Sequence, residues 1–589
     1  MSRVDTAAWT TVAAFAFPLL LAAAMPIRAL RPLTTALAPW AALPALLLAV
    51  GLRGRATVDW ASAVFGMQLG AQGMVAQAFL LFTACLWLAA GLFARAYMAE
   101  DPHRPRFWLF FLATSSGNIG LVLARDVATF YLFYALMTFA AYGMVVHDRT
   151  EAALRAGRVY LVMALAGEML LLMAFFLIAG ADINVGLEDV PRVVAASAHR
   201  ELLGALVLVG FGVKAGAILL HMWLPLAHPV APTPASAVLS GAIIKAGLLG
   251  WLRFLPLGEV ALPAHGAACV VAGASAAFYG VALGLTQRDP KTILAYSSIS
   301  QMGFMTAAIG VGLSNPAVVP SVVAAIVFYA THHAVAKGAL FLGTGVARAT
   351  GSGWPGRLVT LGLLWPALDI SGAPLSSGAL AKISLKSVVE EASWGTTPLP
   401  WLLSVGAVAS TVLMIHFLHR TIPRSTEPGA PGAGLWVPWA SLLVLDLVLL
   451  ARPPVTPEDA ALLLHADKIW GAAWPVIVGV VVAAGVGVLR RRGARLRVRV
   501  PPGDLLYLVD AALPRLERAV LAAREAWISA PLRKGRALQA SIARVSDRLL
   551  QAAEKVEVDL AAFRTIGLLF LFGILVLAAQ LLSTSMGGR

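Results

Sequence analysis

The chain has 589 residues, of which 59% are hydrophobic and 13% are charged, and its mean hydropathy is +0.81. Soluble domains carry about 25% charged residues, so the composition excludes a soluble globular protein and indicates that most of the chain lies in lipid. The formal net charge of +15 would suggest nucleic acid binding in a soluble protein. Here the arginines cluster beside apolar segments, so we expect membrane lipid and not nucleic acid as a partner.

The sequence offers little that could hold a cofactor. Its two cysteines, Cys85 and Cys269, both lie in apolar runs, and an iron–sulfur cluster typically needs about four thiolates. No glycine-rich GxGxxG or P-loop motif is present, and no close set of three or four ligand residues supports a metal site. We therefore expect no cofactor, and any chemistry that drives the protein must take place in another subunit.

Apolar segments long enough to cross a bilayer, which takes roughly 20 residues, recur along the chain and predict an all-α polytopic membrane protein. The first is not followed by a small-residue cleavage site, so we expect it to be retained. The segments, about sixteen in number, are 8–25, 33–51, 75–95, 107–123, 127–146, 158–180, 201–223, 234–256, 264–286, 292–312, 321–346, 358–394, 399–418, 434–452, 470–489 and 563–584.

Two places in this series predict breaks. The segment 358–394 is too long and too polar for one straight helix, because Pro374, Gly378 and two serines lie in its middle. Pro232 and Pro234 similarly predict a break between helices just before Ser236. Broken helices expose carbonyl groups and helix ends to polar cavities, and they recur where membrane proteins bind ions.

Loop charges predict the orientation. The loops that follow odd-numbered segments hold most of the arginine and lysine, and they include 95–106, 149–158 and 490–499. The positive-inside rule then places these loops in the cytoplasm and the N-terminus outside. We expect a multi-pass protein of the bacterial inner membrane.

Residues 503–557 are rich in charge, but they keep apolar residues at helical spacing, such as Leu508, Leu516 and Ile542. This pattern favours an amphipathic helix along the membrane surface, kinked or split at Pro514 and Pro531. A soluble two-helix tail is the alternative. The expected domains are N-terminal helices (1–100), a first half (101–256), a second half (257–420), further helices (421–500), the surface helix (501–560) and an anchoring helix (561–589).

Ionisable side chains inside apolar segments are costly, so each is a hypothesis for a functional site. Glu168 lies in LVMALAGEMLLLMAFF, Lys214 in LVGFGVKAGAILL and Lys245 in LSGAIIKAGLLG. The remaining candidates are His332, His333, Lys337, Lys382, Lys386, Glu390 and Glu391. A row of lysines with histidine and carboxylates is suited to proton relay. His333 and Lys337 share one helix face, because they are four residues apart.

Some of these residues also have a plain structural interpretation. Lys386 could snorkel to an interface, His332 could simply hydrogen-bond a carbonyl group, and Glu390 could lie in an exit loop. Lys291 fits an interfacial position better than a place in the path. Lys214, Lys245 and Lys337 lie far from any expected interface, and the proton path depends mainly on them.

The stretch KAGAILLHMWLPLAHPVAPTPASAVLSGAIIKAG resembles the signature of the antiporter-like subunits of respiratory complex I, energy-converting membrane hydrogenases, formate hydrogenlyase and Mrp-type antiporters. DPKTILAYSSISQMGFM, THHAVAKGALFLGTG and PLSSGALAK resemble further blocks of that family. The resemblance spans at least residues 120–390, and its wording leans towards the hydrogenase type. It implies two inverted five-helix repeats with two broken helices, and a C-terminal lateral helix with an anchor.

The resemblance also implies roles. Lys214 matches the lysine that pairs with a carboxylate in the first half, and Lys245 and His333 match the central hydrophilic axis. Lys337 matches the central lysine, and Lys382 matches the lysine of the second broken helix, usually taken as the exit. Glu168 matches an acidic position in the sixth helix.

One departure concerns the first half. The family usually has a glutamate, the partner of the lysine at Lys214, where this chain has Ala135. Glu168 could take over the pairing; otherwise the first half is impaired. Tyr329 also replaces a second histidine that some members carry, and a tyrosine passes a proton less readily near neutral pH.

These observations predict a proton-translocating membrane subunit of a redox-linked, multi-subunit complex, itself without catalytic residues. The expected partners are other antiporter-like and redox subunits, and the ion is the proton, with sodium as an alternative. A sodium/proton antiporter or a subunit for uptake of a solute such as inorganic carbon is a second interpretation. A largely structural subunit, impaired by Ala135, is a third.

Overall fold

The computed structural model of the protein describes residues 3–51, 57–61, 67–71, 73–180, 185–392, 399–422, 432–451, 465–492, 500–506, 518 and 521–522. The chain divides into two units, Met1–Pro502 and Gly503–Arg589. All helices and strands named below belong to the first unit. The expected surface helix at 501–560 and the anchoring helix after it fall almost wholly outside the described residues and stay predictions.

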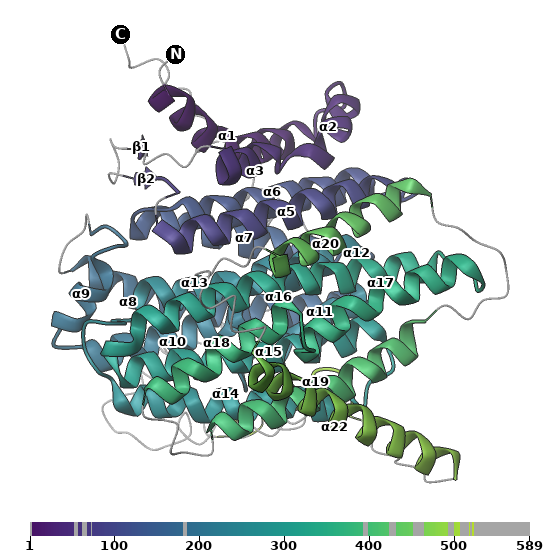
Figure 1. The fold of residues 1–589 in the computed structure, drawn as a ribbon. Helices are drawn as coiled ribbons and strands as arrows, with labels where there is room; N and C mark the ends of the chain where they lie inside the picture. Colours follow the sequence, from purple (N-terminus) through teal and green to yellow (C-terminus); the bar gives the residue numbers. More distant parts are fainter. Residues whose placement is uncertain are drawn as a thin grey trace. The chain divides into compact units, whose positions relative to one another are not determined.

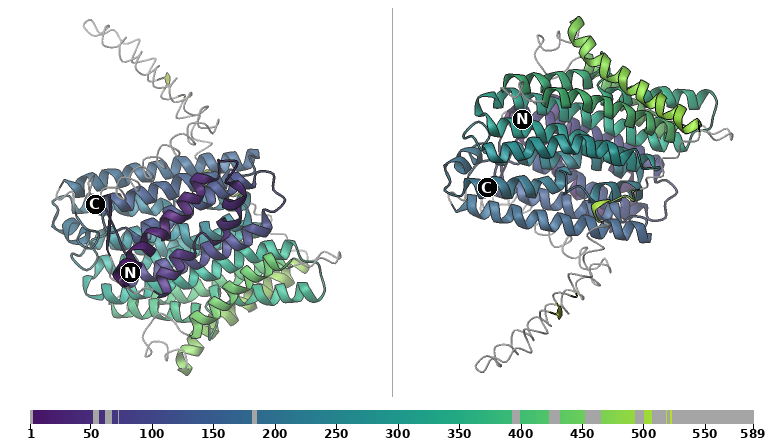
Figure 2. Two further views of the ribbon diagram at one scale, coloured as in Figure 1. Left: turned by 90° about the horizontal axis from the view of Figure 1, so that it is seen from above. Right: turned by 90° about the horizontal axis from the view of Figure 1, so that it is seen from below.

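The N-terminal helices lie on one side of the bundle (Figures 1 and 2). They are α1 (Arg3–Ala24), α2 (Arg31–Leu37), the short 3-10 helix η1 (Ala38–Trp40) and α3 (Leu43–Gly51). The prolines at 39 and 44 explain why the second apolar segment is divided, since proline ends or kinks a helix. α1 packs on α6, and α3 packs on α5.

A small hairpin corrects the all-α expectation. Strands β1 (Val58–Ala61) and β2 (Met67–Leu69) pair antiparallel. The hairpin is fixed to the bundle, because the Gln68 N–H donates to Asp126 Oδ2 at 2.7 Å and the Arg125 N–H donates to the Gln68 carbonyl at 3.0 Å. The periodicity of long apolar runs gave no signal for strands this short.

The first half of the bundle follows. Its helices are α5 (Gly73–Tyr97), α6 (Arg104–Leu123), α7 (Val127–Val145), α8 (Glu151–Ala179), the short α9 (Val190–Ala196), α10 (Arg200–Ala215), α11 (Trp223–Val230), α12 (Thr233–Val238), the π-helical turn η2 (Leu239–Ile243) and α13 (Ile244–Phe254). Side-chain caps begin two of them: Asp126 accepts from the Thr129 N–H, and Thr150 accepts from the Ala153 N–H.

The expected segment 201–223 is not one helix. α10 ends at Ala215, and Gly216 follows in the left-handed conformation with φ of 70°. Leu219 also has a positive φ, 70°. A second interruption falls at Ala231 and Pro232, where the prolines predicted it. The first half therefore contains two breaks in close succession, and the glycine break was not anticipated.

The second half contains the closest helix pair. Its elements are α14 (Pro263–Gly284), α15 (Pro290–Ser314), the 3-10 helix η3 (Pro316–Val318) and α16 (Val319–Arg348). A Cβ on Gly273 would lie 2.4 Å from the Gly303 carbonyl oxygen, and a Cβ on Gly303 would lie 2.5 Å from the Gly273 oxygen. Only glycine allows this backbone approach, a device common between membrane helices.

The last described helices are α17 (Trp354–Ser371), α18 (Ser377–Glu391), α19 (Leu399–Thr421), α20 (Ala433–Ala451) and α22 (Ala466–Arg491). The predicted break in 358–394 is confirmed, because Gly372 is left-handed with φ of 80° and Ser376 caps α18. α20 packs against α16, α17 and α5, and α22 packs against α19. α22 lies on the side of the bundle opposite α1 (Figure 2).

Among the described residues, twelve helical segments are long and apolar enough to cross a membrane. α15 and the two halves of each broken helix, α10 with α11 and α17 with α18, do not meet that criterion individually. The protein is thus mostly helical and rich in membrane-spanning helices. The count of about sixteen spans and the inverted repeat remain predictions.

Candidate functional site

Lys214 lies at the C-terminal end of α10, just before the first break. It is 2% exposed, and its ammonium donates to the Tyr160 hydroxyl at 3.1 Å. The Tyr160 hydroxyl in turn donates to the Thr138 carbonyl at 2.9 Å. The free carbonyls of a helix C-terminus carry partial negative charge, which favours a cation there. The break therefore accommodates the buried lysine.

Glu168 lies on α8, 4% exposed, and interacts electrostatically with Lys214 without a direct ion pair. Its Oε2 accepts from the Tyr131 hydroxyl at 3.5 Å, and its Oε1 has no hydrogen-bond partner. Thr138 also approaches this carboxyl group. Tyr131 and Thr138 stand four residues before and three residues after Ala135, so Glu168 faces the side of α7 where the alanine lies.

Two central lysines are linked through serine side chains. Lys245 donates to the Ser240 carbonyl at 2.7 Å, and the Ser240 and Ser298 hydroxyls are 2.8 Å apart. Ser298 donates to the Leu294 carbonyl at 3.0 Å, and Lys337 donates to the same oxygen at 3.0 Å. Ser240 lies in the π-helical turn, a distortion that frequently marks functional sites.

Two histidines, His333 and His228, face this centre. His333 is fully buried, neither ring nitrogen has a hydrogen-bond partner, and it interacts electrostatically with Lys245 and Lys337. His332 on the same helix instead turns to the second break. His228 on α11 was not singled out from the sequence, although it lies in the quoted motif. It is fully buried, stacks on Phe341 at 4.6 Å, and also faces the central lysines.

Lys291 was interpreted as an interfacial residue, but its side chain is directed into the bundle. It is 2% exposed, and its ammonium donates to the Ala231 carbonyl at 2.5 Å. That carbonyl belongs to the break between α11 and α12. Lys291 therefore binds the free backbone of a helix break, as Lys214 and Lys382 occupy the ends of other half-helices.

The second break holds Lys382. Its ammonium donates to the carbonyls of Ile370 and Ser371, both at 2.9 Å, which are among the last of α17. It lies over the Phe304 ring at 5.8 Å and packs against Gly372. Lys382 is thus held by the negative end of a half-helix, with a cation–π contact on one side.

A cavity of about 240 Å³ borders Lys382 and extends to Lys386 and Glu390. Gly372 and Glu390 line it together with the lysines. Lys386 and Glu390 are 3.9 Å apart, and their side chains are 44% and 51% exposed. This exposure fits the snorkelling and exit-loop alternatives for these two residues, whereas Lys382 is half-buried. Glu391 is exposed.

The residues beside Lys382 include an acidic cluster that the sequence reading missed. Asp369 is fully buried and accepts from the Gly378 N–H at 2.7 Å and from the Ser377 hydroxyl at 3.0 Å; its Oδ2 is 2.7 Å from His332 Nδ1. Asp446 of α20 is 1% exposed and joins it. Both acids lie in apolar runs, so the rule that selected Glu168 would also have selected them.

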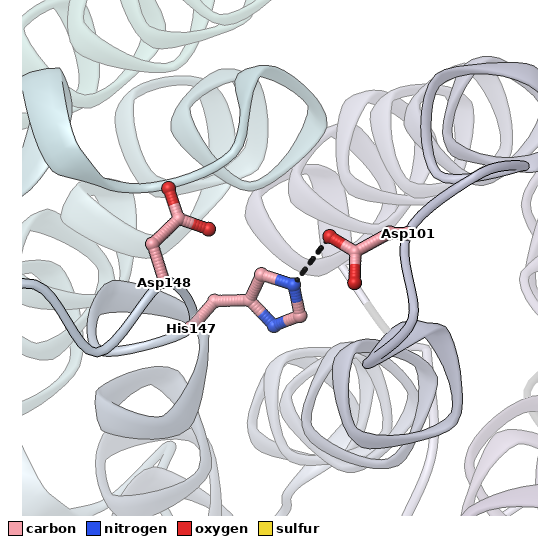
Figure 3. A group of neighbouring side chains, drawn as sticks. All are labelled: Asp101, His147 and Asp148. Atoms are coloured by element: carbon pink, nitrogen blue, oxygen red, sulfur yellow. Dashed lines mark hydrogen bonds and ion pairs between the residues drawn. The ribbon is translucent and has the colours of Figure 1, made fainter.

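A second acidic cluster lies near the ends of the helices. Figure 3 shows the His147 ring pointing to Asp101, with the Asp148 carboxylate on the other side. His147 Nε2 is 3.0 Å from Asp101 Oδ2, and the Arg106 guanidinium donates to the His147 carbonyl. These contacts join the loop after α5 to the loop after α7, and they lie apart from the lysine path.

The structure brings most of the expected residues together. Lys245, His333 and Lys337 share one buried centre, Glu168 and Lys214 lie near the first break, and Lys382 and His332 lie at the second. Lys386 and Glu390 lie farther out, along the cavity. Within each group of described residues, the lysines are held by hydroxyl groups and backbone carbonyls and not by ion pairs with carboxylates within 4 Å, apart from Lys386 with Glu390.

Comparison with known proteins shows which family this part of the chain resembles. Residues 124–396 match the model of the family described as NADH:quinone oxidoreductase/Mrp antiporter, transmembrane. Residues 124–396 are thus similar to the antiporter-like membrane domain of this family. The breaks, the central lysines and Lys382 all fall within the match, whereas Asp446 lies beyond it.

Two relatives and one solved structure also resemble parts of the chain. An uncharacterized protein of Mycobacterium tuberculosis is 32% identical over 390 residues, which cover 59% of this chain and 59% of that protein. Hydrogenase-4 component B of Escherichia coli is 30% identical over 276 residues, covering 45% of this chain and 41% of that protein. The chain thus spans about three fifths or less of the length of these relatives.

The solved structure supports the fold alone. A chain in the structure of the Mrp complex from Dietzia sp. DQ12-45-1b superposes with a TM-score of 0.65 at 20% identity, covering 79% of this chain and 99% of that one. The antiporter-like architecture therefore extends well beyond residues 124–396.

Proposed function

We propose that the protein translocates protons as an antiporter-like membrane subunit of a multi-subunit, energy-coupling complex. The observation that carries this proposal is the buried chain from Lys245 through Ser240 and Ser298 to the carbonyl that also binds Lys337. Buried lysines in a membrane protein mark ion pathways, and hydroxyl groups between them donate and accept protons. Names of the relatives, such as a hydrogenase component and an Mrp complex, agree with partner subunits.

The proposed path begins at Glu168 and Lys214, continues through Lys245, His333 and Lys337, and leaves by Lys382. His228 and Tyr160 are added to it from their contacts. The cavity beside Lys382 leads past Lys386 to Glu390, and these two residues form the proposed exit. Each transfer moves one proton between a lysine amine, an imidazole or a hydroxyl and a bridging water.

The arrangement of Glu168 supports the proposal that it replaces the glutamate missing at Ala135. Its carboxyl group lies against the α7 face that carries the alanine, between Tyr131 and Thr138. A charge at Glu168 can therefore influence Lys214, as the missing glutamate would. This favours an active first half over a purely structural subunit.

Lys337→Ala provides the test of the proposal. The full chain with its co-purifying subunits is reconstituted in liposomes with pyranine inside, and proton uptake is driven by a potassium diffusion potential. We expect Lys337→Ala to remove proton uptake while assembly is retained. Arg192→Ala, at a basic residue of α9 with a 70% exposed side chain, is the control and should match the wild type.

If Lys337→Ala assembles and takes up protons at the wild-type rate, the proposed function is wrong and a scaffold role is favoured. Sodium-dependent uptake in the wild type would favour antiport instead. The inner membrane, with the N-terminus outside, is the proposed location, and protease access to an N-terminal tag in oriented vesicles tests it.

A further inference from the structure

The cluster beside the second break places two carboxyl groups in one buried site. A ring nitrogen of His332 and one oxygen each of Asp369 and Asp446 all lie within 4.8 Å of one another. The three residues are 0%, 0% and 1% exposed. They come from α16, α17 and α20, helices that pack on one another, so the site does not arise from neighbours in the sequence.

The two acids have opposite surroundings. Asp369 receives the Gly378 N–H, the Ser377 hydroxyl and a contact from His332 Nδ1, so its charged form is surrounded by donors. Asp446 approaches Asp369, Trp365 and Ser377, but neither of its oxygens has a hydrogen bond of good geometry. Donors to the charged form favour ionisation, and burial without donors opposes it.

Two buried carboxylates this close cannot both stay ionised unless a cation lies with them. Among the described residues, Asp446 forms no ion pair. The His332 ring pairs with Asp369 through Nδ1, and Lys382 uses its ammonium on the carbonyls of Ile370 and Ser371. The charge is therefore best placed on Asp369, and a proton on Asp446. A protonated Asp446 can donate to Asp369 or to the His332 ring.

We propose that Asp446 holds a proton and exchanges it with Asp369 and His332, which gives the second break a proton store beside Lys382. When the proton moves from Asp446 to Asp369, one O–H bond breaks and one forms, and the negative charge moves from Asp369 to Asp446. The carboxyl pair keeps a net charge of minus one in this step. A transfer from Asp446 to the His332 ring instead leaves both carboxyl groups negative and the ring positive, so the charge of the three groups together is unchanged. The role of this store in transport rests on the proposed function.

The proposed proton store extends the proton path to α20, the helix that carries Asp446. Residues 124–396 end before α20, so the matched family domain does not include Asp446. Asp369 adjoins Ile370 and Ser371, whose carbonyls bind Lys382, so a change in charge at the acid pair is felt directly at that lysine. The full burial of all three residues favours a proton over a hydrated metal ion as the occupant.

Infrared spectroscopy of the full-length protein, with its co-purifying subunits and in water and heavy water, tests the proposal without any transport. The wild type should show the carbonyl stretching band of a protonated carboxyl group, and Asp446→Asn should lose that band. Asn replaces a neutral acid isosterically, so assembly should be retained. Asp467→Asn, at an acid whose side chain is 71% exposed, is the control and should keep the band.

An unchanged band in Asp446→Asn would overturn the proposal, as would one stoichiometric metal ion that is measured by mass spectrometry and lost in Asp446→Asn. The proposed function fails separately, by the Lys337→Ala outcome above. If the wild type takes up no protons but the band still disappears in Asp446→Asn, the assignment of the proton to Asp446 stands and only its role in transport falls.

Discussion

The two broken helices hold their lysines in similar ways and their acids in different ways. Lys214 lies in the last turn of α10, and the Lys382 ammonium reaches from α18 to the last carbonyls of α17. Both cations therefore lie at the C-terminal end of a half-helix, where free carbonyls favour a positive charge. Glu168 has one long hydrogen bond at 3.5 Å, from Tyr131, besides the approach of Thr138, whereas Asp369 has donors on both oxygens. The first acid is thus free to change its charge or position, and the second is fixed.

The largest effect is expected where the second break is tightest. A Cβ in Gly378→Ala would lie 1.9 Å from the Asp369 carbonyl oxygen, a backbone atom that cannot move aside. We expect a loss of about 3 kcal/mol, the upper range for overpacking, measured by thermal unfolding in detergent. Gly216→Ala at the first break meets only the end of Leu224, at 2.9 Å, and should cost about 1 kcal/mol for its left-handed backbone.

Gly485→Ala is the control for both, because nothing lies within 4 Å of its Cβ. It should leave stability unchanged or raise it slightly, as alanine favours a helix over glycine. Equal losses in Gly378→Ala and Gly216→Ala would show that the two breaks are equally tight, and the comparison would be wrong.

Glu168→Gln removes the adjustable acid of the first break. We expect proton uptake to fall about tenfold, which corresponds to roughly 1.4 kcal/mol, because Lys214 loses its nearby negative charge. Ala135→Glu restores the carboxylate that the family usually carries on the facing helix, and it should recover part of the loss. Glu188→Gln, at an acid whose side chain is 70% exposed, is the matched control.

Should Ala135→Glu fail to rescue Glu168→Gln while raising uptake in the wild-type background, the two acids act at different points. The view that Glu168 replaces the missing glutamate would then be abandoned. The measurement is the same pyranine assay that is used for Lys337→Ala.

Tyr160→Phe sharpens the comparison on the lysine side. It deletes the hydroxyl that receives the Lys214 ammonium and leaves that buried donor without its partner. An unsatisfied buried donor costs about 1–3 kcal/mol, so we expect uptake to slow by about threefold to tenfold and stability to fall modestly. Tyr97→Phe, at an exposed tyrosine whose hydroxyl accepts from Thr233, is the control. Wild-type uptake in Tyr160→Phe would exclude the hydroxyl from the path.

The smallest effect is expected away from both breaks. Partial burial opposes ionisation of Asp101, but contacts with His147 and the His103 N–H outweigh it, so the pKa of Asp101 lies below its ordinary value. The carboxylate therefore stabilises the folded protein at pH values above the ordinary pKa of an aspartate. This contribution is lost as the pH falls through the lowered pKa. Asp101→Asn should lower the melting temperature slightly at neutral pH and converge with the wild type in acid.

Thermal unfolding at several pH values measures this difference, and proton uptake should be unchanged. A gap between Asp101→Asn and the wild type that widens towards acid would contradict the sign. Asp148→Asn, which changes the neighbouring carboxylate, serves as the control.

The sequence predicted the membrane class, the break in 358–394 and the lysine core, because apolar length, proline and buried charge are local signals. It did not predict the glycine break after Ala215, since a left-handed residue depends on how the next segment packs. Asp369 and Asp446 were visible as acids in apolar runs but were passed over. Their contact with His332 could not be predicted from the sequence, because it joins three separate helices.

The central lysines have a property that an ion pair would not give them. Lys245 and Lys337 are held by carbonyl oxygens, and a carbonyl accepts a hydrogen bond from a neutral amine as well as from an ammonium group. Either lysine can therefore lose its proton and keep the same bond in the same place. The buried centre can therefore change its charge without a shift of its heavy atoms. One lysine can then influence the next through its electric field, with no conformational change.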